Sequence, residues 1–229
     1  MLVAVVGGNL QGVEAAYLAK KAGWEVTVID RKAVVPAAGL GDRFSQVNIT
    51  TEKDLERALK GIDLVIPALE NDQALACMQR WSQNSEMPFA FDSFAYSIAS
   101  SKLKSDQLFA RIEVPAPLPW PECGFPVLAK PSRGSGSQKV SVFYNSEDLR
   151  AHQNESVEEW VLQEFVPGPS YSIEVLGRPG YYLPLQVTDL QMDANYDCKR
   201  VLAPTDLTTG LISELEKISR LIAEQIALK

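Results

Sequence analysis

The residues best suited to chemistry begin with a lysine at the end of an apolar run. Phe125 to Ser137 reads FPVLAKPSRGSGS, in which a strand-like segment ends at Lys130 and a loop of Ser, Gly and Arg follows. Successive backbone N–H groups in such a loop form a concave site for anions, and the ammonium group of Lys130 supplies a compact positive charge at its mouth. This combination predicts a site for phosphate groups.

A second segment further along the chain could hold a purine ring. Gln163 to Gly168 reads QEFVPG and follows Leu162. Leu162, Phe165 and Val166 give apolar faces, while the extended backbone between them offers one N–H and one C=O group to the edge of a ring. Taken alone, the GSGS loop would be a plain turn or linker. With Lys130 before it and QEFVPG after it, nucleotide binding is favoured.

Composition limits the classes of protein to which the chain can belong. Its 229 residues are 46% hydrophobic, enough to bury the core of one large domain or two small ones. The 22 basic and 29 acidic residues give a net charge of −7, and no basic run with interleaved aromatic residues occurs, which disfavours nucleic acid as a partner. The apolar start, MLVAVVGG, is too short for a membrane span or a signal peptide, so we expect a cytoplasmic protein without a membrane partner.

Counting residues excludes several kinds of catalytic site. His152 is the only histidine, which excludes a histidine-based triad and a metal site with several histidines. The cysteines, Cys77, Cys123 and Cys198, form no CxxC pair and are odd in number, which suits free thiols in a reducing compartment. We assign none of these four residues a chemical role.

The start of the chain has the pattern of a parallel α/β domain. Residues 2–6 are an apolar run, followed by a glycine turn from Gly7 to Gly12 and a helical pattern that ends at Gly23. A strand from Glu25 to Ile29 ends at Asp30 and completes a βαβ unit, so ligands are expected at the carboxyl ends of the strands. The turn reads G-G-x-x-x-G instead of G-x-G-x-x-G, which disfavours a dinucleotide; the helix N-terminus could still hold the carboxylate of a small substrate.

Later elements bring a candidate carboxylate to the same edge of the sheet. Thr51 and Asp54 have the spacing of a capping box that opens a helix to Lys60, and Ile62 to Ala68 is the next buried strand. Glu70 follows this strand and could hold a substrate ammonium group, although a solvated loop acid is an equally good interpretation. We also expect a helix over Asp72–Gln83, a strand over Phe89–Phe91 and a helix over Tyr96–Arg111.

A proline-rich run predicts a domain boundary. Pro115 to Pro121 reads PAPLPWP, which forces an extended linker. In the second part, Tyr171–Leu176 alternates as a strand with Ser172 and Glu174 on one face. The other elements expected there are a strand over Lys139–Tyr144, a short helix, strands over Glu159–Val166 and Tyr181–Val187, a turn over Asn195–Cys198 and an amphipathic helix over Thr208–Leu228.

A lysine that ends an apolar strand, a Ser/Gly loop and a strand that ends in QEFVPG occur in the order typical of the ATP-grasp family, which this chain resembles. The stretches GGNLQGVEAAYLAKKAG, LAKP, QEFVPG, YSIEV and NYDC are, within that family, similar to the amino-acid ligases of pyrrolysine biosynthesis. The resemblance implies an α/β fold, with a Rossmann-like parallel sheet in a pre-ATP-grasp domain over residues 1–114. An incomplete α+β ATP-grasp domain over residues 115–229 would follow, with its small lobe at about 122–166.

The resemblance also implies an activity. ATP would convert the carboxylate of (3R)-3-methyl-D-ornithine, a D-ornithine-type amino acid, to an acyl phosphate, and the ε-amine of L-lysine would attack it to give an amide, ADP and phosphate. The implied cofactors are ATP and Mg²⁺. Another ATP-grasp amino-acid ligase, a non-catalytic amino-acid or nucleotide-binding protein, and an oxidoreductase that uses the glycine turn and Asp30 for a nicotinamide cofactor remain alternatives.

Site residues follow from the same resemblance, with Lys130 and Glu174 as the catalytic pair. The residues near the nucleotide would be Asn9, Asp30, Asn48, Ile49, Lys102, Lys130, Ser137, Gln163, Glu164, Phe165 and Val166. Leu10, Gln11 and Glu70 would hold lysine, and Ser172, Ile173, Glu174 and Asp197 would hold the D-amino acid. The family usually has a lysine where Asn9 stands and an acid where Asn48 stands.

The family takes its Mg²⁺ carboxylates from strands that follow a helix such as Thr208–Leu228. The sequence ends before such strands, so we expect a truncated chain that lacks the metal-binding part, or one half of a split enzyme, and no metal ligand is assigned. A homodimer and a completing second chain both stay open as assemblies.

Overall fold

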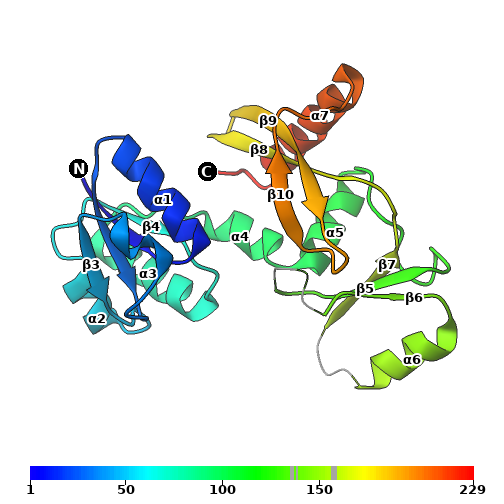
Figure 1. Ribbon diagram of the computed structural model, residues 1–229, viewed down its shortest axis with the longest axis horizontal. Helices are drawn as coiled ribbons and strands as arrows, with labels where there is room; N and C mark the ends of the chain where they lie inside the picture. Colours follow the sequence, from blue (N-terminus) through cyan, green and yellow to red (C-terminus); the bar gives the residue numbers. More distant parts are fainter. Residues whose placement is uncertain (135–136, 138, 156–158) are drawn as a thin grey trace. The chain divides into compact units, whose positions relative to one another are not determined.

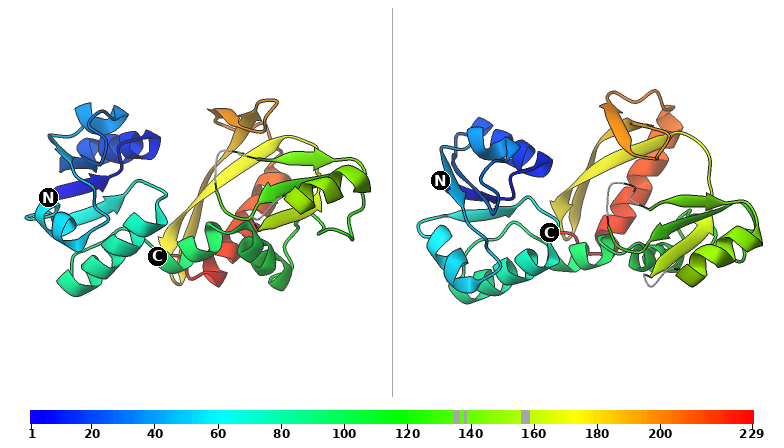
Figure 2. Two further views of the ribbon diagram at one scale, coloured as in Figure 1. Left: turned by 90° about the horizontal axis from the view of Figure 1, so that it is seen from below. Right: turned by 60° about the horizontal axis from the view of Figure 1, so that its bottom comes forward.

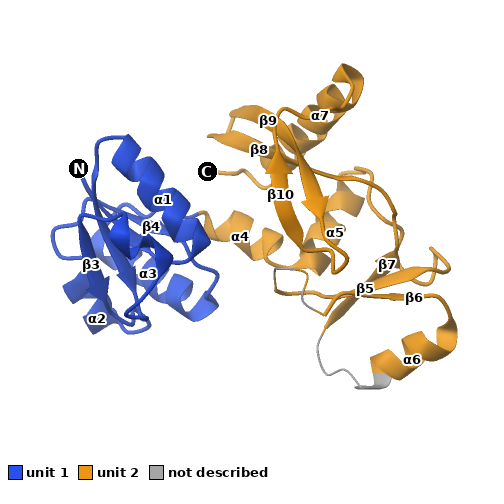
Figure 3. Ribbon diagram, in the orientation of Figure 1, with its two compact units in different colours: residues 1–91 blue, residues 92–229 orange. Residues whose placement is uncertain are grey.

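The computed structural model describes residues 1–134, 137, 139–155 and 159–229. The chain forms two compact units, residues 1–91 and residues 92–229 (Figures 1 and 3). The proline run Pro115 to Pro121 lies within the second unit, after two helices of that unit. A separation of substrate-binding and nucleotide-binding domains at residue 115 stays a prediction.

Unit 1 is built on four parallel strands. These are β1 (Leu2–Val6), β2 (Glu25–Asp30), β3 (Arg43–Gln46) and β4 (Leu64–Pro67), in the order β3-β2-β1-β4. Val3 of β1 pairs with Val26 of β2, and both side chains are buried. Burial on both faces explains why β1 (LVAVV) reads as a continuous apolar run, whereas the edge strand β3 (RFSQ) is polar and has no buried residue. The strand expected over Phe89–Phe91 is wrong in extent, since only a single bridge joins Phe89 to Val65.

Helices connect these strands. They are α1 (Leu10–Lys21), the 3₁₀ helix η1 (Pro36–Gly39), α2 (Glu52–Ala58) and α3 (Asp72–Ser85). The helix start predicted at Thr51 is confirmed: the Thr51 hydroxyl caps α2 by accepting a hydrogen bond from the Asp54 N–H group at 3.4 Å, and it donates one to the Asp54 carboxylate at 2.8 Å in place of the reciprocal backbone bond of a full capping box. This cap uses one of the N–H groups that a helix start leaves without a backbone partner.

Close packing explains the glycines of the turn between β1 and α1. Gly7 has a φ angle of 110°, and a Cβ atom there would lie 2.3 Å from the carbonyl oxygen of Ala68. A Cβ atom at Gly12 would lie 2.0 Å from the carbonyl oxygen of Gly7. A Cβ atom at Gly7 would meet the segment after β4, and one at Gly12 of α1 would meet the turn, so only hydrogen fits at these positions.

Unit 2 starts with two helices where the sequence predicted one. In place of a continuous helix over Tyr96–Arg111, the structure has α4 (Ser93–Ala99) and α5 (Lys102–Arg111). Ser101 has extended backbone angles, φ −124° and ψ 113°, and its hydroxyl accepts a hydrogen bond from the Lys104 N–H group at 3.4 Å. The prediction was wrong here because a serine that caps a new helix breaks the backbone ladder of the preceding one.

A small antiparallel sheet follows. It consists of β5 (Val127–Pro131), β6 (Ser141–Phe143) and β7 (Trp160–Glu164), in the order β6-β5-β7, with helix α6 (Ser146–Glu155) between β6 and β7. Val127 and Ala129 of the predicted lysine strand are fully buried. The ring of His152 packs between Phe143 and Trp160, with ring centroids 5.0 and 4.3 Å away.

A longer sheet and a helix complete unit 2. The strands β8 (Ser170–Arg178), β9 (Tyr181–Met192) and β10 (Cys198–Leu202) lie in the order β10-β9-β8, and α7 (Thr209–Gln225) packs against β8 and β9 (Figures 1 and 2). Pairing shifts register between Ile173 and Val175, so Glu174 lies at an irregular point of the ladder. The sequence predicted the turn before β10 but not β10 itself. None of the described helices, α7 included, combines the length and apolar character needed to cross a membrane.

Substituting Gly12 tests the packing of α1 against the turn. We expect Gly12→Ala to lower the free energy of unfolding by about 1–3 kcal/mol, because the added methyl group overlaps the Gly7 carbonyl. Denaturant unfolding followed by circular dichroism measures this change. Gly210→Ala is the matched control: Gly210 lies in α7 with open space around it, and alanine there should stabilise by about 0.5–1 kcal/mol. Unchanged stability of Gly12→Ala would contradict the packing explanation.

Candidate functional site

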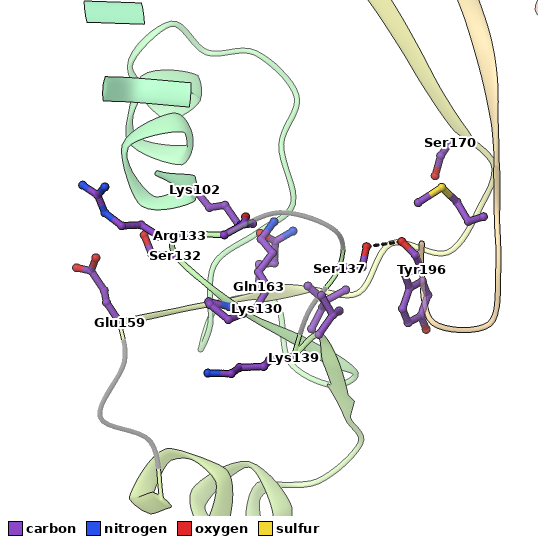
Figure 4. Close-up of a pocket in the computed structure, with 15 residues that line it drawn as sticks. Lys102, Lys130, Ser132, Arg133, Ser137, Lys139, Glu159, Gln163, Ser170 and Tyr196 are labelled. Atoms are coloured by element: carbon purple, nitrogen blue, oxygen red, sulfur yellow. Dashed lines mark hydrogen bonds between the residues drawn. The ribbon is translucent and has the colours of Figure 1, made fainter. Parts of the chain in front are cut away.

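One cavity of unit 2 collects cationic side chains around the predicted phosphate loop. Its volume is about 780 Å³, within the range of small-molecule sites (Figure 4). The described lining consists of Lys102, Leu128, Lys130, Pro131, Ser132, Arg133, Gly134, Ser137, Lys139, Val140, Glu159, Gln163, Ser170, Met192 and Tyr196. The structure therefore brings together four of the predicted nucleotide contacts, namely Lys102, Lys130, Ser137 and Gln163.

The cavity is positively charged although the chain as a whole carries a net charge of −7. Lys102 comes from α5, Lys130 from β5, and Arg133 and Lys139 from the β5–β6 loop, whereas Glu159 is the one carboxylate of the described lining. Sequence reasoning missed Arg133, Lys139 and Glu159; the two basic residues that flank the GSGS loop were the available signal. Four cations around one cavity suit a polyanionic ligand.

Lys130 is the cation with the most perturbed surroundings. Burial lowers the pKa of its ammonium group, the carboxylate of Asp106 raises it, and the nearby ammonium group of Lys102 lowers it. Burial and a like charge both disfavour the protonated form, whereas an anion placed next to it would favour that form. A phosphate group bound next to Lys130 would therefore stabilise its protonated form.

Hydrogen bonds fix the start of the loop against α5 and against Glu159, the residue before β7. The Lys102 N–H group donates to the Ser132 carbonyl oxygen at 2.8 Å, and the Lys102 ammonium group donates to the Gly134 carbonyl oxygen at 2.8 Å. The hydroxyl groups of Ser101 and Ser132 lie 3.3 Å apart and are buried. The Ser132 N–H group donates to the Glu159 carbonyl oxygen at 2.8 Å. The loop thus leaves β5 in a fixed direction, with Lys102 and Lys130 beside it.

The turn between β9 and β10 forms the opposite wall. The Ser137 hydroxyl donates a hydrogen bond to the Tyr196 carbonyl oxygen (Figure 4), and the rings of Tyr196 and Phe165 pack edge to face with a centroid distance of 6.1 Å. Tyr196 was not predicted; the neighbouring Asp197 was. Ser135 and Gly136, the rest of the predicted Ser135–Ser137 phosphate loop, lie outside the described residues.

In the predicted purine-binding segment, two backbone N–H groups already have hydrogen-bond partners within the protein. The N–H group of Glu164 donates to the Leu118 carbonyl oxygen at 2.8 Å, and the N–H group of Phe165 donates to the Pro126 carbonyl oxygen at 3.2 Å. Neither group is therefore available to a purine edge. Val166 comes next in the chain with a side chain that is 60% exposed, and its backbone stays the predicted contact.

The residues predicted to hold a D-amino acid lie on the longer sheet. The Ser172 hydroxyl is 2.7 Å from that of Thr188 across the strand pair, Ile173 pairs with Val187, and Glu174 is exposed. Asp197 accepts a hydrogen bond from the Lys199 ammonium group at 3.2 Å. The described lining of the cavity includes Ser170 of the same strand but none of these four predicted residues, so their role stays a prediction.

Unit 1 brings the three predicted lysine contacts to one edge of its sheet. Leu10 and Gln11 follow β1, Glu70 follows β4, and the Gln11 side-chain amide donates to the Glu70 carboxylate at 3.2 Å. Leu10 is 74% exposed. In the strand order β3-β2-β1-β4, β2 and β3 are added on one side of β1 and β4 is added on the other side. Open α/β sheets bind ligands at the carboxyl ends of the two strands that flank such a switch point, here β1 and β4. The pair therefore lies where the topology favours a ligand.

The other predicted residues of unit 1 also follow strand ends. Asn9 comes after β1 and is exposed, and Asn48 comes after β3 and is exposed. The Asp30 carboxylate at the end of β2 accepts hydrogen bonds from the N–H groups of Gly8 and Lys32, each at 2.8 Å. Ile49 is 5% exposed. Asp30 thus holds the glycine turn in place, and Ile49 belongs to the interior of unit 1.

Mg²⁺ binds several oxygen ligands, usually including one or two carboxylates. Among the described residues, no three His, Cys, Asp or Glu side chains are grouped so as to hold a metal ion. Glu159 is the single carboxylate of the cavity's described lining, and it stands among four cationic side chains. Since Mg²⁺ takes near-octahedral oxygen ligands, these residues do not by themselves form a magnesium site.

Similarity to known proteins agrees with this geometry. The ATP-grasp domain family matches residues 99–226, which include every described residue that lines the cavity. Over 200 residues, the chain is 32% identical to 3-methyl-D-ornithine--L-lysine ligase of Methanosarcina mazei, an alignment that covers 87% of this chain and 53% of that protein. The chain spans about half the length of the curated relatives it matches.

Solved structures share the fold. The ADP complex of purK, an N5-carboxyaminoimidazole ribonucleotide synthetase, superposes with a TM-score of 0.83 at 18% identity, covering 98% of this chain and 63% of that one. The L-amino acid ligase from Bacillus licheniformis has a TM-score of 0.74 at 15% identity, covering 99% and 60%. Because residues 99–226, more than half of the chain, match the family, this chain belongs to the ATP-grasp family.

Proposed function

We propose that this protein is an ATP-dependent carbon–nitrogen ligase that binds ATP in the cavity of unit 2. The observation that carries the proposal is the convergence of Lys102 and Lys130 on a cavity whose wall also includes Gln163. Two ammonium groups in a half-buried site suit the oxygens of a polyphosphate, because charge-assisted hydrogen bonds are stronger than neutral ones. The purK structure of the same fold is an ADP complex, which supports a nucleotide as the ligand.

The proposed chemistry has two steps. A substrate carboxylate oxygen attacks the γ-phosphorus of ATP, the bond to the β-γ bridging oxygen breaks, and an acyl phosphate and ADP result. An amine then attacks the acyl carbon, loses a proton, and expels phosphate as the amide bond forms. Neither step needs a nucleophilic side chain, which agrees with a cavity whose described lining is rich in cations.

The side chains would act by position and charge. Lys102 and Lys130 would gather phosphate oxygens and stabilise the charge that moves onto the β-phosphate, while backbone groups near Val166 would fix the purine. Glu174 would orient the ammonium group of the amino acid that is activated. Mg²⁺, when bound to the nucleotide, would neutralise part of the phosphate charge.

For substrates we propose a D-ornithine-type amino acid as the carboxylate and L-lysine as the amine. The relative in Methanosarcina mazei carries these substrates in its name. The Gln11–Glu70 pair supports a lysine site in unit 1, since a carboxylate oriented by an amide can accept hydrogen bonds from an ammonium group. The exposed side chain of Leu10 lies next in the chain and would cover the aliphatic part of lysine.

Two alternative functions, a ligase for other amino acids and a non-catalytic nucleotide-binding protein, are each supported by one observation. The fold shared with an L-amino acid ligase keeps a different pair of amino acids open. The four cations of the cavity's described lining suit a polyanion by themselves, which also fits a protein that binds nucleotide without turnover. A nicotinamide cofactor is less well supported, because both oxygens of the Asp30 carboxylate already accept backbone hydrogen bonds.

The nucleotide is the first point to measure. We expect ATP and ADP to raise the melting temperature in differential scanning fluorimetry and NAD to leave it unchanged, because a ligand that binds only the folded state stabilises it by mass action. At a ligand concentration one hundred times Kd, this stabilisation is about 2.7 kcal/mol. A higher melting temperature with NAD alone would overturn the assignment of ATP.

Lys130 should contribute more to nucleotide affinity than a lysine outside the cavity. Removing a charge-assisted hydrogen bond costs about 1.5–3 kcal/mol, so Lys130→Ala should weaken ADP binding roughly tenfold or more in calorimetry. Lys104→Ala is the matched control, since Lys104 is an exposed residue of α5 outside the cavity lining. Equal losses in the two variants would remove Lys130 from the site.

Glu70 should determine lysine binding in unit 1. Glu70→Gln keeps the shape of the side chain but removes its charge, so the affinity for L-lysine in calorimetry should fall roughly tenfold or more. Glu56→Gln, on the exposed surface of α2, should bind lysine like the wild type. If the wild-type chain binds no lysine, the assignment of this site is wrong.

Turnover separates the proposed ligase from the alternatives. Mass spectrometry of the products and an ADP-release assay would be run with ATP, Mg²⁺, L-lysine and a D-ornithine-type acid. ADP release that needs both amino acids and yields their amide supports the proposed substrates. An amide only with a different amino-acid pair supports the other ligase. Because the described residues do not by themselves form a magnesium site, nucleotide binding without ADP release fits both a non-catalytic protein and a ligase that needs further metal ligands. Turnover that is restored when the C-terminal part of a ligase relative is supplied supports the ligase, and its continued absence supports the non-catalytic protein.

A further inference from the structure

The turn between β9 and β10 forms a wall of the cavity that the functional assignment has not used. Met192 at the end of β9 and Tyr196 within the turn line the cavity together with Lys102 and Lys130 (Figure 4). The Ser137 hydroxyl donates a hydrogen bond to the Tyr196 carbonyl oxygen. This bond joins the loop after β5 to a turn of the longer sheet of unit 2. The structure of the turn therefore bears on the position of the predicted phosphate loop.

The backbone of Tyr196 has a conformation that needs support. Its φ angle is 61°, in the left-handed region that bulky side chains rarely adopt. Ser137, at the other end of the hydrogen bond, has a φ angle of 53°. Residues other than glycine stay in this region only where the surrounding contacts hold them there. The contacts of the turn must therefore fix the direction of the Tyr196 carbonyl group.

Those contacts converge on Asp193. One oxygen of its carboxylate accepts hydrogen bonds from the N–H groups of Asn195 at 2.8 Å and Asp197 at 3.0 Å, the two residues that flank Tyr196. The Asp193 carbonyl oxygen accepts a bond from the Tyr196 N–H group at 3.0 Å. The second carboxylate oxygen lies 3.3 Å from the Lys199 ammonium group. The N–H groups of Asp197 and Asn195 lower the pKa of the Asp193 carboxyl group, so this acceptor is charged at neutral pH.

The hydroxyl group of Ser137 has only one hydrogen to donate. The structure shows this hydrogen bond going to the Tyr196 carbonyl oxygen. The oxygens of an ionised phosphate group accept hydrogen bonds and donate none. While Ser137 is bonded to Tyr196, its side chain has no hydrogen left for a phosphate group. The side chain therefore anchors the loop, and it affects a bound nucleotide through the position of that loop.

We propose that Asp193 is a positioning residue of the nucleotide site, whose carboxylate holds the β9–β10 turn so that the Tyr196 carbonyl oxygen anchors the phosphate loop through Ser137. This role rests on the proposed function of the cavity as a nucleotide site. Asp193 is not part of the described cavity lining, so it acts through the turn. The Tyr196 ring packs against Phe165, and the turn thereby also contacts the predicted purine-binding segment.

A double-mutant cycle on ADP affinity tests this path. Calorimetry would compare wild type with Ser137→Ala, Asp193→Ala and the double variant. Each single change should weaken ADP binding by up to about tenfold, the effect of losing one hydrogen bond. The double variant should bind about as weakly as the weaker single variant, because both changes remove the same anchor. Losses that multiply, or wild-type affinity in either single variant, would overturn the proposal.

Two control variants separate positioning from general stability. Asp193→Asn keeps an oxygen for the two N–H groups and loses only an exposed ion pair, so it should bind ADP within about twofold of wild type. Asp42→Ala in unit 1 is the matched control, since Asp42 also accepts a backbone N–H group, from Val26 at 2.8 Å, and pairs with Lys20 at 2.6 Å. It should lower the free energy of unfolding without weakening ADP binding. Equal losses of ADP affinity in Asp42→Ala and Asp193→Ala would overturn the role of Asp193.

Hydrogen exchange tests the anchor without any nucleotide. In the full chain, Ser137→Ala should speed amide exchange in a peptide over residues 193–199, because the turn loses its contact with the loop. A peptide from α1 should exchange as in wild type. This small substitution keeps the test available if the melting temperature shows that Asp193→Ala does not fold. Unchanged exchange of the turn would overturn the proposal.

The outcomes distinguish this role from the proposed function. Losses that multiply in the cycle would overturn the role of Asp193 and leave the nucleotide site intact. No ADP binding by wild type would overturn the proposed function of the cavity. In that case, faster exchange in Ser137→Ala would show an anchored loop without a nucleotide role, which also overturns this proposal.

Discussion

The candidate nucleotide site depends on the docking of the α5 start onto the loop after β5. Ser101 and Ser132 are 4% and 1% exposed, and their hydroxyl groups form a hydrogen bond with each other. Buried polar groups are costly without partners, so this contact admits few alternative arrangements of the two segments. Because Lys102 follows Ser101 directly and Lys130 lies two residues before Ser132, this contact and the hydrogen bonds of Lys102 to the Ser132 and Gly134 carbonyl oxygens hold together the two segments that carry the lysines.

The same docking explains how an acidic chain forms a cationic cavity. At physiological salt, charges separated by more than about 8 Å are largely screened, so the net charge of −7 has little effect inside the site. Charges brought close together in a half-buried place interact much more strongly than charges in water. Placing the ammonium groups of Lys102 and Lys130 in one site therefore costs electrostatic free energy. A negative charge reduces this cost, whether it comes from the carboxylate of Asp106 or from the phosphates of a ligand.

Local patterns were enough to predict some parts of the fold and of the site. The βαβ start, the cap of α2 and the buried strand before Lys130 each follow from apolar periodicity or from a short spacing. The break between α4 and α5 could not be predicted, because the capping Ser101 is held by a buried partner 31 residues away. Likewise, Glu159 and Tyr196 reach the cavity only through the packing of β7 and of the β9–β10 turn. A strand pattern predicts extended backbone, but it does not reveal which polar groups the fold itself consumes, such as the N–H group of Phe165.

The glycine turn of unit 1 illustrates why a motif must be interpreted through its contacts. Gly12 is required because α1 passes beside the Gly7 carbonyl, and the Gly8 N–H group donates to the Asp30 carboxylate. In a dinucleotide site the turn must let pyrophosphate approach its backbone, and an acid after the second strand binds ribose. Here the acid binds the turn itself. The glycines and Asp30 therefore stabilise the edge of the sheet. For this reason we propose that the neighbouring Gln11–Glu70 pair, rather than the turn, recognises a ligand there.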